Sequence, residues 1–251
     1  MKIYAVGLGP GDMAYLAPGA KEAIKRSDVV VGYTSYIKLI PDLLAGKEAI
    51  STGMRSEAKR CQAAIDEALQ GKVVSVVCSG DAGVYGMAGL LFELVEARHV
   101  EAEVEIEVVP GITAATAAAA VLGSPLTNDF AVISLSDLLT PWEVIEKRLN
   151  AAALSDMVVC LYNPQSSKRS DYLSRAVQIV MQYREASTVC GYVRNAFRGE
   201  SQSERVCTLE ALPDEPVDML TTVIIGNSDT RVIAGKMVTA RGYRITDIDE
   251  G

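Results

Sequence analysis

Strand-like runs alternate with helical patterns through the first half of the chain, and this alternation restricts the fold more than any other feature. Each predicted strand is short and apolar, and each is followed by a stretch with helical spacing. Such alternation is typical of a parallel sheet with helices on both faces. The predicted strands cover residues 2–8, 28–32, 72–78 and 104–109, and the predicted helices cover residues 16–26, 55–70, 87–97 and a segment from about residue 113.

A second region follows a segment dense in turn residues, G-S-P-L-T-N-D at 123–129. Its predicted strands cover residues 130–135, 157–162 and 188–194, with helices starting at Pro141 and Ser170. The last strand-like runs, 204–209 and 219–225, have little helix between them and therefore predict antiparallel strands. We predict an α/β protein of two α/β domains, the first with a mostly parallel sheet and the second with a mixed sheet. The domains are residues 1–122 and 130–251, and residues 123–129 form the linker.

Three glycine-rich turns carry the strongest functional signal. They contain Gly9-Pro10-Gly11, Gly80-Asp81 and Pro110-Gly111, and each follows a predicted strand. Ligands of α/β proteins usually bind at the carboxyl ends of the strands, so we expect these backbone groups to gather round one small ligand. Asp12 stands where the dinucleotide fingerprint needs its third glycine, and no phosphate-loop motif is present. An ordinary NAD-binding domain and a phosphate-loop enzyme are therefore disfavoured.

Charge and the single histidine exclude further classes. Lys and Arg number 24 against 32 Asp and Glu, a net charge of −8, which disfavours a general nucleic-acid binder. His99 is the only histidine and lies among charged residues, so histidine-rich metal sites are excluded and no metal is expected. A histidine-dependent hydrolase would have to rely on His99 and is disfavoured, because no G-x-S-x-G motif is present. A polyanionic substrate would need a local group of cations.

Cysteine usage and hydropathy indicate a cytoplasmic protein. The five cysteines are scattered singly, which is typical of reduced thiols. The chain begins without an apolar signal core, so we expect no signal peptide. Its most apolar stretch, 114–122, is far shorter than the roughly 20 residues that span a bilayer, so no membrane association is expected.

Four motifs of the first half resemble the tetrapyrrole methylase family. They are G-x-G-P-G-D near the start, G-D-x-x-x-Y-G, P-G-I-T-A and L-G-S-P-L-T. The resemblance implies methyl transfer from S-adenosylmethionine, with S-adenosylhomocysteine as product, in a cleft between two α/β domains of a homodimer. It also implies a set of cofactor-binding residues: Gly9, Pro10, Gly80, Asp81, Val84, Tyr85, Thr113 and Ala114 in the first half, and Tyr162, Asn163, Val193, Arg194, Thr221 and Thr222 in the second. Phe197 departs from the pattern, because a smaller residue is expected there.

Motifs of the second half narrow the resemblance to the C(17)-methylating, ring-contracting branch of the family, the precorrin-3B C(17)-methyltransferases of cobalamin biosynthesis. These motifs are S-L-S-D-L-L-T-P-W at 134–142, L-Y-N-P-Q-S at 161–166, G-Y-V-R-N at 191–195, and segments 221–228 and 237–243. The implied substrate is a polycarboxylate tetrapyrrole, precorrin-3B or its cobalt form, with hand-over to neighbouring pathway enzymes. The sequence leaves open whether the substrate carries cobalt.

Ring contraction needs acid–base groups, and the substrate carboxylates need cations. We expect Asp137, Ser136 and Tyr85 to be catalytic, although Asp137 could instead be the N-terminal partner of the Pro141 helix. We expect Lys168, Arg169, Arg194, Arg198 and Thr140 to contact substrate. Two alternatives remain at this point. One is another methylase of the family, acting on a different corrin position, on ribosomal RNA or on diphthamide. The other is a non-catalytic nucleotide-binding regulator.

Overall fold

The structure, a computed structural model, describes residues 1–166 and 169–243. The chain divides into two compact units. The first unit comprises residues 1–114 together with the short segment 197–199, and the second comprises residues 115–196 and those from Glu200 onward. Each unit contains its own sheet and its own hydrophobic core, which confirms the predicted α/β class.

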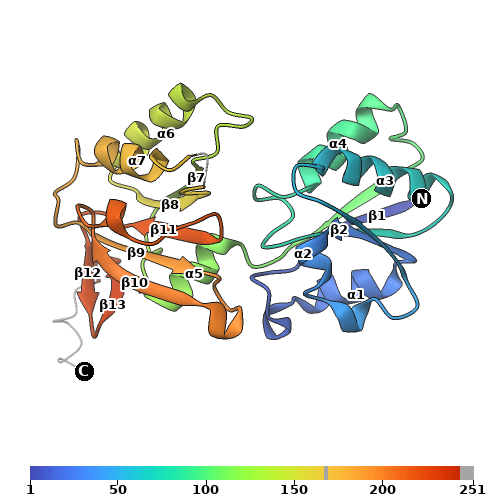
Figure 1. Ribbon diagram of the computed structural model, residues 1–251, viewed down its shortest axis with the longest axis horizontal. Coiled ribbons are helices and arrows are strands. Elements are labelled where there is room, and N and C mark those ends of the chain that lie inside the picture. Colours follow the sequence, from blue (N-terminus) through green and yellow to red (C-terminus); the bar gives the residue numbers. More distant parts are fainter. Residues whose placement is uncertain (167–168, 244–251) are drawn as a thin grey trace. The chain divides into compact units, whose positions relative to one another are not determined.

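The first unit is built on a five-stranded sheet in the order β3-β2-β4-β1-β5, and all neighbouring strands are parallel. Figure 1 shows α3 and α4 on one face of this sheet and α1 and α2 on the other. The strands are β1 (Lys2–Gly7), β2 (Val29–Tyr33), β3 (Glu48–Thr52), β4 (Val74–Cys78) and β5 (Glu105–Val109). The helices are α1 (Pro18–Arg26), α2 (Thr34–Ile37), α3 (Glu57–Leu69) and α4 (Ala88–Ala97).

Alternating side chains of the strands form two cores, one on each face of the sheet. Ile3 and Ala5 of β1 pack with α3 and α4, whereas Val6 packs with α1 on the opposite face. This period of two explains why the strands are nearly continuous apolar runs. Edge strand β3 was not predicted, because its sequence is not an apolar run. Its only apolar residues are Ala49 and Ile50, and neither is fully buried.

The second unit contains a mixed five-stranded sheet in the order β10-β9-β11-β8-β7. The neighbouring strands β7 and β8 are parallel, and the other neighbouring pairs are antiparallel. Helices α6 and α7 cover one face, and α5 lies on the other (Figure 1). The strands of this sheet are β7 (Phe130–Ser134), β8 (Val158–Tyr162), β9 (Val189–Arg194), β10 (Ser203–Thr208) and β11 (Thr221–Ile225). The helices are α5 (Ala114–Leu122), α6 (Trp142–Leu154) and α7 (Tyr172–Val180).

A small sheet in the order β12-β13-β6 completes the second unit. Its strands are β12 (Thr230–Ile233), β13 (Lys236–Thr239) and β6 (Gly123–Ser124). Strand β6 lies inside the segment predicted as a linker and pairs in parallel with β13. The sequence did not predict this sheet, since β6 has only two residues and its partner is more than a hundred residues away.

Helix α5, apart from its first residue Ala114, belongs to the second unit, so the units divide at residues 114–115 and not at the predicted linker 123–129. This helix is apolar except for Thr116, and six of its nine residues are buried. It packs closely on β9: a Cβ on Gly191 would lie 2.9 Å from the side chain of Leu122. Lys236 also donates a hydrogen bond to the carbonyl oxygen of Val121 at 2.9 Å.

The single histidine is exposed, and the cysteines of the apolar strands are buried, as the sequence indicated. His99 is exposed in the turn after α4, and the five cysteines form no disulfide. Cys78 and Cys160 are buried, and burial raises their pKa values to about 11 and about 12. Among the described residues, no helix is long and apolar enough to cross a membrane.

Candidate active site

The three glycine-rich turns lie side by side in the first unit. Their position follows from the topology: β1 and β4 are neighbours, but the chain leaves β1 toward one face of the sheet and β4 toward the other. Ligands of α/β sheets bind at this kind of switch point. Gly9 and Gly80 exchange two backbone hydrogen bonds here, N–H to O distances of 3.0 and 2.7 Å. The predicted convergence of the turns is therefore confirmed.

Asp81 fastens the second turn to the third. One carboxylate oxygen accepts a hydrogen bond from the backbone N–H of Gly83 at 2.8 Å, and the other accepts from Gly111 at 2.9 Å. The turns approach so closely that a Cβ on Gly111 would lie 2.2 Å from the carbonyl oxygen of Gly80. A glycine is required at position 111 for this reason. Asp81 thus shapes the predicted cofactor site through its backbone partners.

The remaining first-half candidates border these turns. The α-carbon of Thr113 and the amide nitrogen of Ala114 lie about 3.8 Å from the position that a Gly80 Cβ would take. Val84 and Tyr85 are 37% and 59% exposed, which is high for large apolar side chains beside backbone turns. A ligand seated on the turns would cover such side chains. Tyr85 belongs to the first unit, whereas Asp137 and Ser136, the other predicted catalytic residues, belong to the second.

Arg198 lies against the first two turns, where the sequence predicted a contact with substrate. Its Nε donates to the carbonyl oxygen of Pro10 at 2.7 Å, and its Nη2 donates to the Ser79 hydroxyl at 2.9 Å. The neighbouring Phe197 packs on Tyr15 with ring centroids 4.2 Å apart. The large Phe197 side chain is therefore accommodated by packing on Tyr15, and residues 197–199 are part of the first unit.

The second-half candidates gather at one edge of the second sheet. This edge holds the carboxyl ends of β7, β8 and β9 and the start of β11, because β11 runs antiparallel to β8 and β9. Thr221 is paired with Arg194, and Thr222 with Val193. The residues of this edge are Tyr162, Asn163, Val193, Arg194, Thr221 and Thr222. The structure thus brings together all the cofactor residues predicted in the second half.

Two of these candidates have clear structural partners. The Arg194 Nε contacts Asp218 at 2.8 Å, and Asp218 also accepts a hydrogen bond from the Thr221 hydroxyl at 2.9 Å. Partial burial opposes the ionised form of Asp218, but these hydrogen bonds outweigh it and lower its pKa. The Tyr162 hydroxyl accepts a hydrogen bond from the backbone N–H of Ala115 at 2.7 Å. This N–H lies in the first turn of α5, where backbone N–H groups have no partner within the helix.

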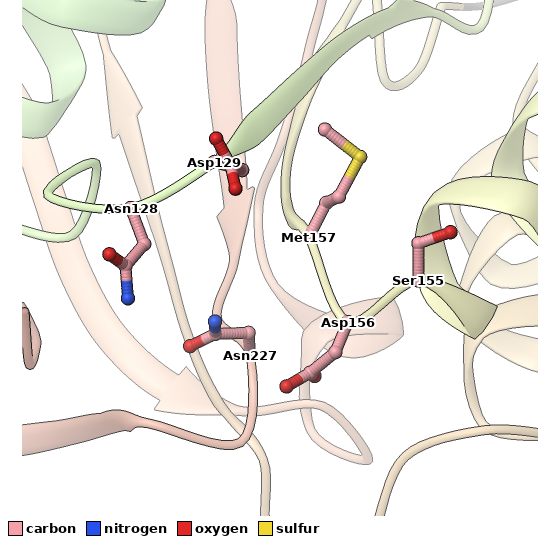
Figure 2. Close-up of a pocket in the computed structure, with 6 residues that line it drawn as sticks. All are labelled: Asn128, Asp129, Ser155, Asp156, Met157 and Asn227. Carbon is pink, nitrogen blue, oxygen red and sulfur yellow. The ribbon is translucent and has the colours of Figure 1, made fainter. Parts of the chain in front are cut away.

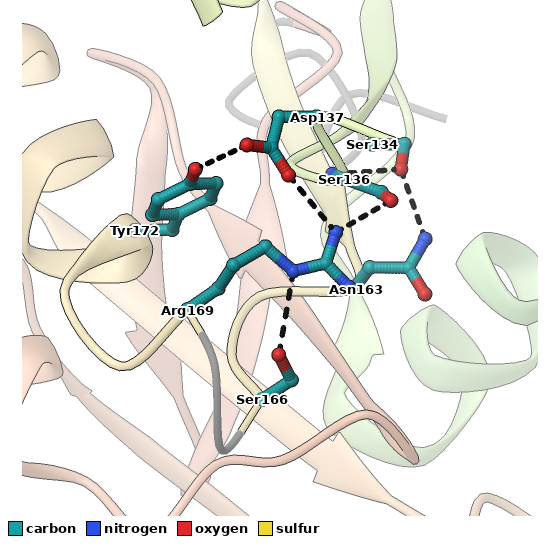
Figure 3. Close-up of polar contacts among 7 residues, drawn as sticks. All are labelled: Ser134, Ser136, Asp137, Asn163, Ser166, Arg169 and Tyr172. Carbon is teal, nitrogen blue, oxygen red and sulfur yellow. Dashed lines mark hydrogen bonds and ion pairs between the residues drawn. The ribbon is translucent and has the colours of Figure 1, made fainter. Parts of the chain in front are cut away.

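A polar cluster at the same edge joins Asp137 to Arg169. Figure 3 shows these side chains in the loops that follow β7 and β8. The Arg169 Nη1 donates to the Ser136 hydroxyl at 2.6 Å and lies 3.4 Å from Asp137. Ser134 links the two loops, since it accepts from Asn163 at 2.9 Å and from the Ser136 N–H at 3.2 Å. Thr140 is half-buried near the end of the first loop, and Lys168 lies outside the described residues.

The surroundings of Asp137 keep its side chain ionised. The Tyr172 hydroxyl donates to it at 2.5 Å, and this hydrogen bond lowers the pKa of Asp137, with Arg169 adding to the effect. A carboxylate with a lowered pKa is poorly suited to proton transfer near neutral pH. The alternative reading as a helix cap is wrong, because Pro141 occupies the N-cap position of α6 and no side chain caps it.

One polar hollow of about 470 Å³ lies elsewhere in the second unit (Figure 2). Its lining includes Asp129 before β7, Met157 before β8 and Asn227 after β11. These positions mark the edge of the sheet opposite Tyr162, and no predicted site residue lines the hollow. No group of three His, Cys, Asp or Glu side chains within residues 1–166 and 169–243 is arranged to hold a metal ion.

Sequence reasoning missed several residues that hold the candidates in place, among them Tyr172, Asp218 and Ser79. Asp218 carried a usable signal, since an aspartate three residues before a threonine often forms a local turn. Tyr172 and Ser79 carried none. Their partners are 35 and 119 residues away in the chain.

Two curated proteins are similar to this chain over nearly its whole length. The chain is 46% identical over 240 residues to a probable cobalt-factor III C(17)-methyltransferase of Salmonella typhimurium, covering 96% of this chain and 98% of that protein. It is 45% identical over 246 residues to the cobalt-factor III methyltransferase of Priestia megaterium, covering 97% of this chain but only 45% of that longer protein.

Solved structures agree with these relatives. The crystal structure of the methyltransferase CobJ matches with a TM-score of 0.89 and 38% identity, over 95% of this chain and 98% of that one. A uroporphyrin-III C-methyltransferase of Thermus thermophilus, solved with S-adenosylhomocysteine, matches with a TM-score of 0.68 over 90% of this chain and 97% of that one. Its identity of 20% shows the shared fold alone. Residues 2–213 match the description "Tetrapyrrole (Corrin/Porphyrin) Methylases", and the chain therefore belongs to the tetrapyrrole methylase family.

Proposed function

We propose that this protein transfers a methyl group from S-adenosylmethionine to C(17) of cobalt-factor III, with contraction of the tetrapyrrole ring. The observation that carries the proposal is the convergence of three backbone turns at the switch point of the first sheet. The names of two relatives at 45% and 46% identity support the substrate and the position of methylation. They favour the cobalt form over metal-free precorrin-3B.

The turns of the first unit suit the cofactor. S-adenosylmethionine, when bound, supplies an electrophilic methyl group on a cationic sulfur. The turns offer uncharged backbone groups from Gly9-Pro10, Gly80 and Thr113-Ala114, and the exposed Val84 and Tyr85 offer apolar contact. A Cβ on Gly111 or on Gly7 would lie within 3 Å of backbone atoms of the neighbouring turns, so no side chain fits at these two positions. We assign the cofactor to these residues.

Methyl transfer demands little proton chemistry. The nucleophilic carbon has to be held in line with the methyl group, about 3–3.5 Å away, in a site without water. Arg169 and Arg194 lie at one edge of the second sheet, and we assign them to carboxylates of the tetrapyrrole. The predicted homodimer, the cleft between the domains, the cytoplasmic location and the hand-over to pathway enzymes stay predictions.

Anaerobic turnover tests the proposal. The purified protein is incubated with S-adenosylmethionine and either cobalt-factor III or precorrin-3B, and products are identified by mass spectrometry. We expect a singly methylated, ring-contracted product from the cobalt form at the higher rate. Absence of methyl transfer to both substrates would overturn the proposal, and methylation without contraction would remove the contraction step from it.

A further inference from the structure

Tyr172 belongs to the Figure 3 cluster, and the sequence assigned it no role. Its hydroxyl donates a hydrogen bond to Oδ2 of Asp137 at 2.5 Å. The other oxygen of the same carboxylate, Oδ1, faces Nη1 of Arg169 at 3.4 Å. Asp137 therefore lies between a tyrosine hydroxyl and a guanidinium, and each of its two oxygens has a partner.

Tyr172 is held firmly in this position. It is the first residue of α7, and its ring packs on Trp142 at the start of α6 with centroids 4.7 Å apart. The Arg175 guanidinium lies 3.9 Å from the centroid of the Trp142 ring. Two helices thus fix the tyrosine ring, and the ring fixes the direction from which its hydroxyl reaches Asp137.

The ionisation of the pair agrees with this geometry. The hydrogen bond between them raises the pKa of Tyr172 and lowers the pKa of Asp137. At neutral pH the tyrosine is therefore the proton donor and Asp137 is a carboxylate. A carboxylate in this state attracts the Arg169 guanidinium and cannot donate a proton.

Three side chains orient Arg169, and part of its guanidinium is left to bind a ligand. Nη1 contacts Ser136 and Asp137, and Nε donates to the Ser166 hydroxyl at 3.3 Å. Nη2 has no hydrogen-bond partner in the part of the chain that the structure describes. Its side chain is only 11% exposed, so the guanidinium is largely desolvated and its orientation is restricted. A preorganised, poorly hydrated guanidinium is well suited to bind a carboxylate.

We propose that Tyr172 is a positioning residue: through Asp137 it holds the Arg169 guanidinium in the orientation that binds a carboxylate of the tetrapyrrole. This inference rests on the proposed function, because that function supplies the carboxylate substrate. It assigns Asp137 to orienting Arg169, in place of the acid–base role predicted from the sequence.

The test replaces Tyr172 with phenylalanine, which keeps the ring and removes only the hydroxyl. The matched control is Tyr183→Phe. Tyr183 follows the same helix and donates one exposed hydrogen bond, to Asn150 at 3.0 Å. KM for cobalt-factor III, kcat and the dissociation constant of S-adenosylhomocysteine are measured for the wild type and both variants, and kcat is followed from pH 6 to pH 9.

We expect Tyr172→Phe to raise KM about five- to twentyfold, since losing one hydrogen bond to a charged group has an effect of this order. We expect kcat, its pH profile and the affinity for S-adenosylhomocysteine to stay within about twofold, and Tyr183→Phe to match the wild type. An unchanged KM in an active Tyr172→Phe enzyme would overturn the positioning role alone. A fall in kcat with a shifted pH profile would overturn it in favour of acid–base catalysis by Asp137. Absence of turnover in the wild type would overturn both this inference and the proposed function.

Discussion

Arg198 donates a hydrogen bond from Nε to the carbonyl oxygen of Pro10 at 2.7 Å, although the two residues are 188 positions apart in the chain. A second donor of the same guanidinium reaches the Ser79 hydroxyl, so one side chain joins the first glycine-rich turn to the start of the second. Arg198 lies beside the turns to which we assign the cofactor, although the sequence predicted that it binds substrate. A substitution of Arg198 can therefore show which of the two ligands it binds.

We predict that Arg198→Gln weakens S-adenosylhomocysteine binding about tenfold in the absence of any tetrapyrrole, because hydrogen bonds from a charged group to the turns are lost. Isothermal titration calorimetry measures this directly. Arg98→Gln is the control, since Arg98 forms an ion pair with Asp66 elsewhere in the first unit. If the affinity for S-adenosylhomocysteine stays at the wild-type value and only KM for the tetrapyrrole rises, Arg198 binds substrate, as the sequence predicted.

Gly111→Ala should damage both folding and cofactor binding. The added Cβ would lie 2.2 Å from the Gly80 carbonyl oxygen, so the backbone of two turns must shift. Overpacking of this kind costs about 1–3 kcal/mol in the free energy of unfolding, which urea denaturation measures. Gly89→Ala is the control: a Cβ on that helical glycine of α4 meets nothing within 4 Å, and alanine favours the helix. Wild-type stability and affinity in Gly111→Ala would mean that the turns are less closely packed than the structure indicates.

Asp137→Asn distinguishes the two roles considered for Asp137. Asparagine keeps the size of the side chain but removes the charge that attracts Arg169. We expect KM for the tetrapyrrole to rise about tenfold while kcat changes little, as for loss of one charge-assisted contact. Steady-state kinetics with identification of the contracted product measures both constants. A loss of about 10²–10⁴-fold in kcat at unchanged KM would instead restore the acid–base role.

The coupling between Tyr172 and Asp137 should depend on pH in a defined direction. The pKa of Asp137 is lowered, so its stabilising contribution is present above about pH 3.9, the ordinary aspartate value, and is lost as the pH falls through the lowered pKa. The pKa of Tyr172 is raised, so its contribution is complete below about pH 10 and is lost as the pH rises through the raised pKa. The coupling should therefore be constant across the neutral range.

A double-mutant cycle with Tyr172→Phe, Asp137→Asn and the combined variant measures this coupling by urea denaturation at several pH values. We expect the two substitutions to be non-additive near pH 7 and to approach additivity as the pH falls through the lowered pKa of Asp137. Additive effects at pH 7 would show that the two side chains do not interact in solution.

The sequence alone determined the local features of this protein. Strand β1, helix α3 and the three turns were predictable because each depends on spacing within a few residues: apolar periodicity, glycine after a strand and proline in a turn. The family resemblance has the same origin, since its motifs are contiguous runs. The candidates of the cofactor turns, such as Gly9, Asp81 and Thr113, were all found in this way.

Only the tertiary structure decided which distant residues act on one another. The attachment of α5 to the second unit depends on the packing of Leu122 against Gly191, and no local pattern around residue 114 shows it. Likewise, Arg198 contacts Pro10 because the segment 197–199 belongs to the first unit. Tyr172 reaches Asp137 because the chain segments that follow β7 and β8 meet at the same edge of the second sheet. Hydrogen bonds and close packing depend on distance in space, and a single sequence records only distance along the chain.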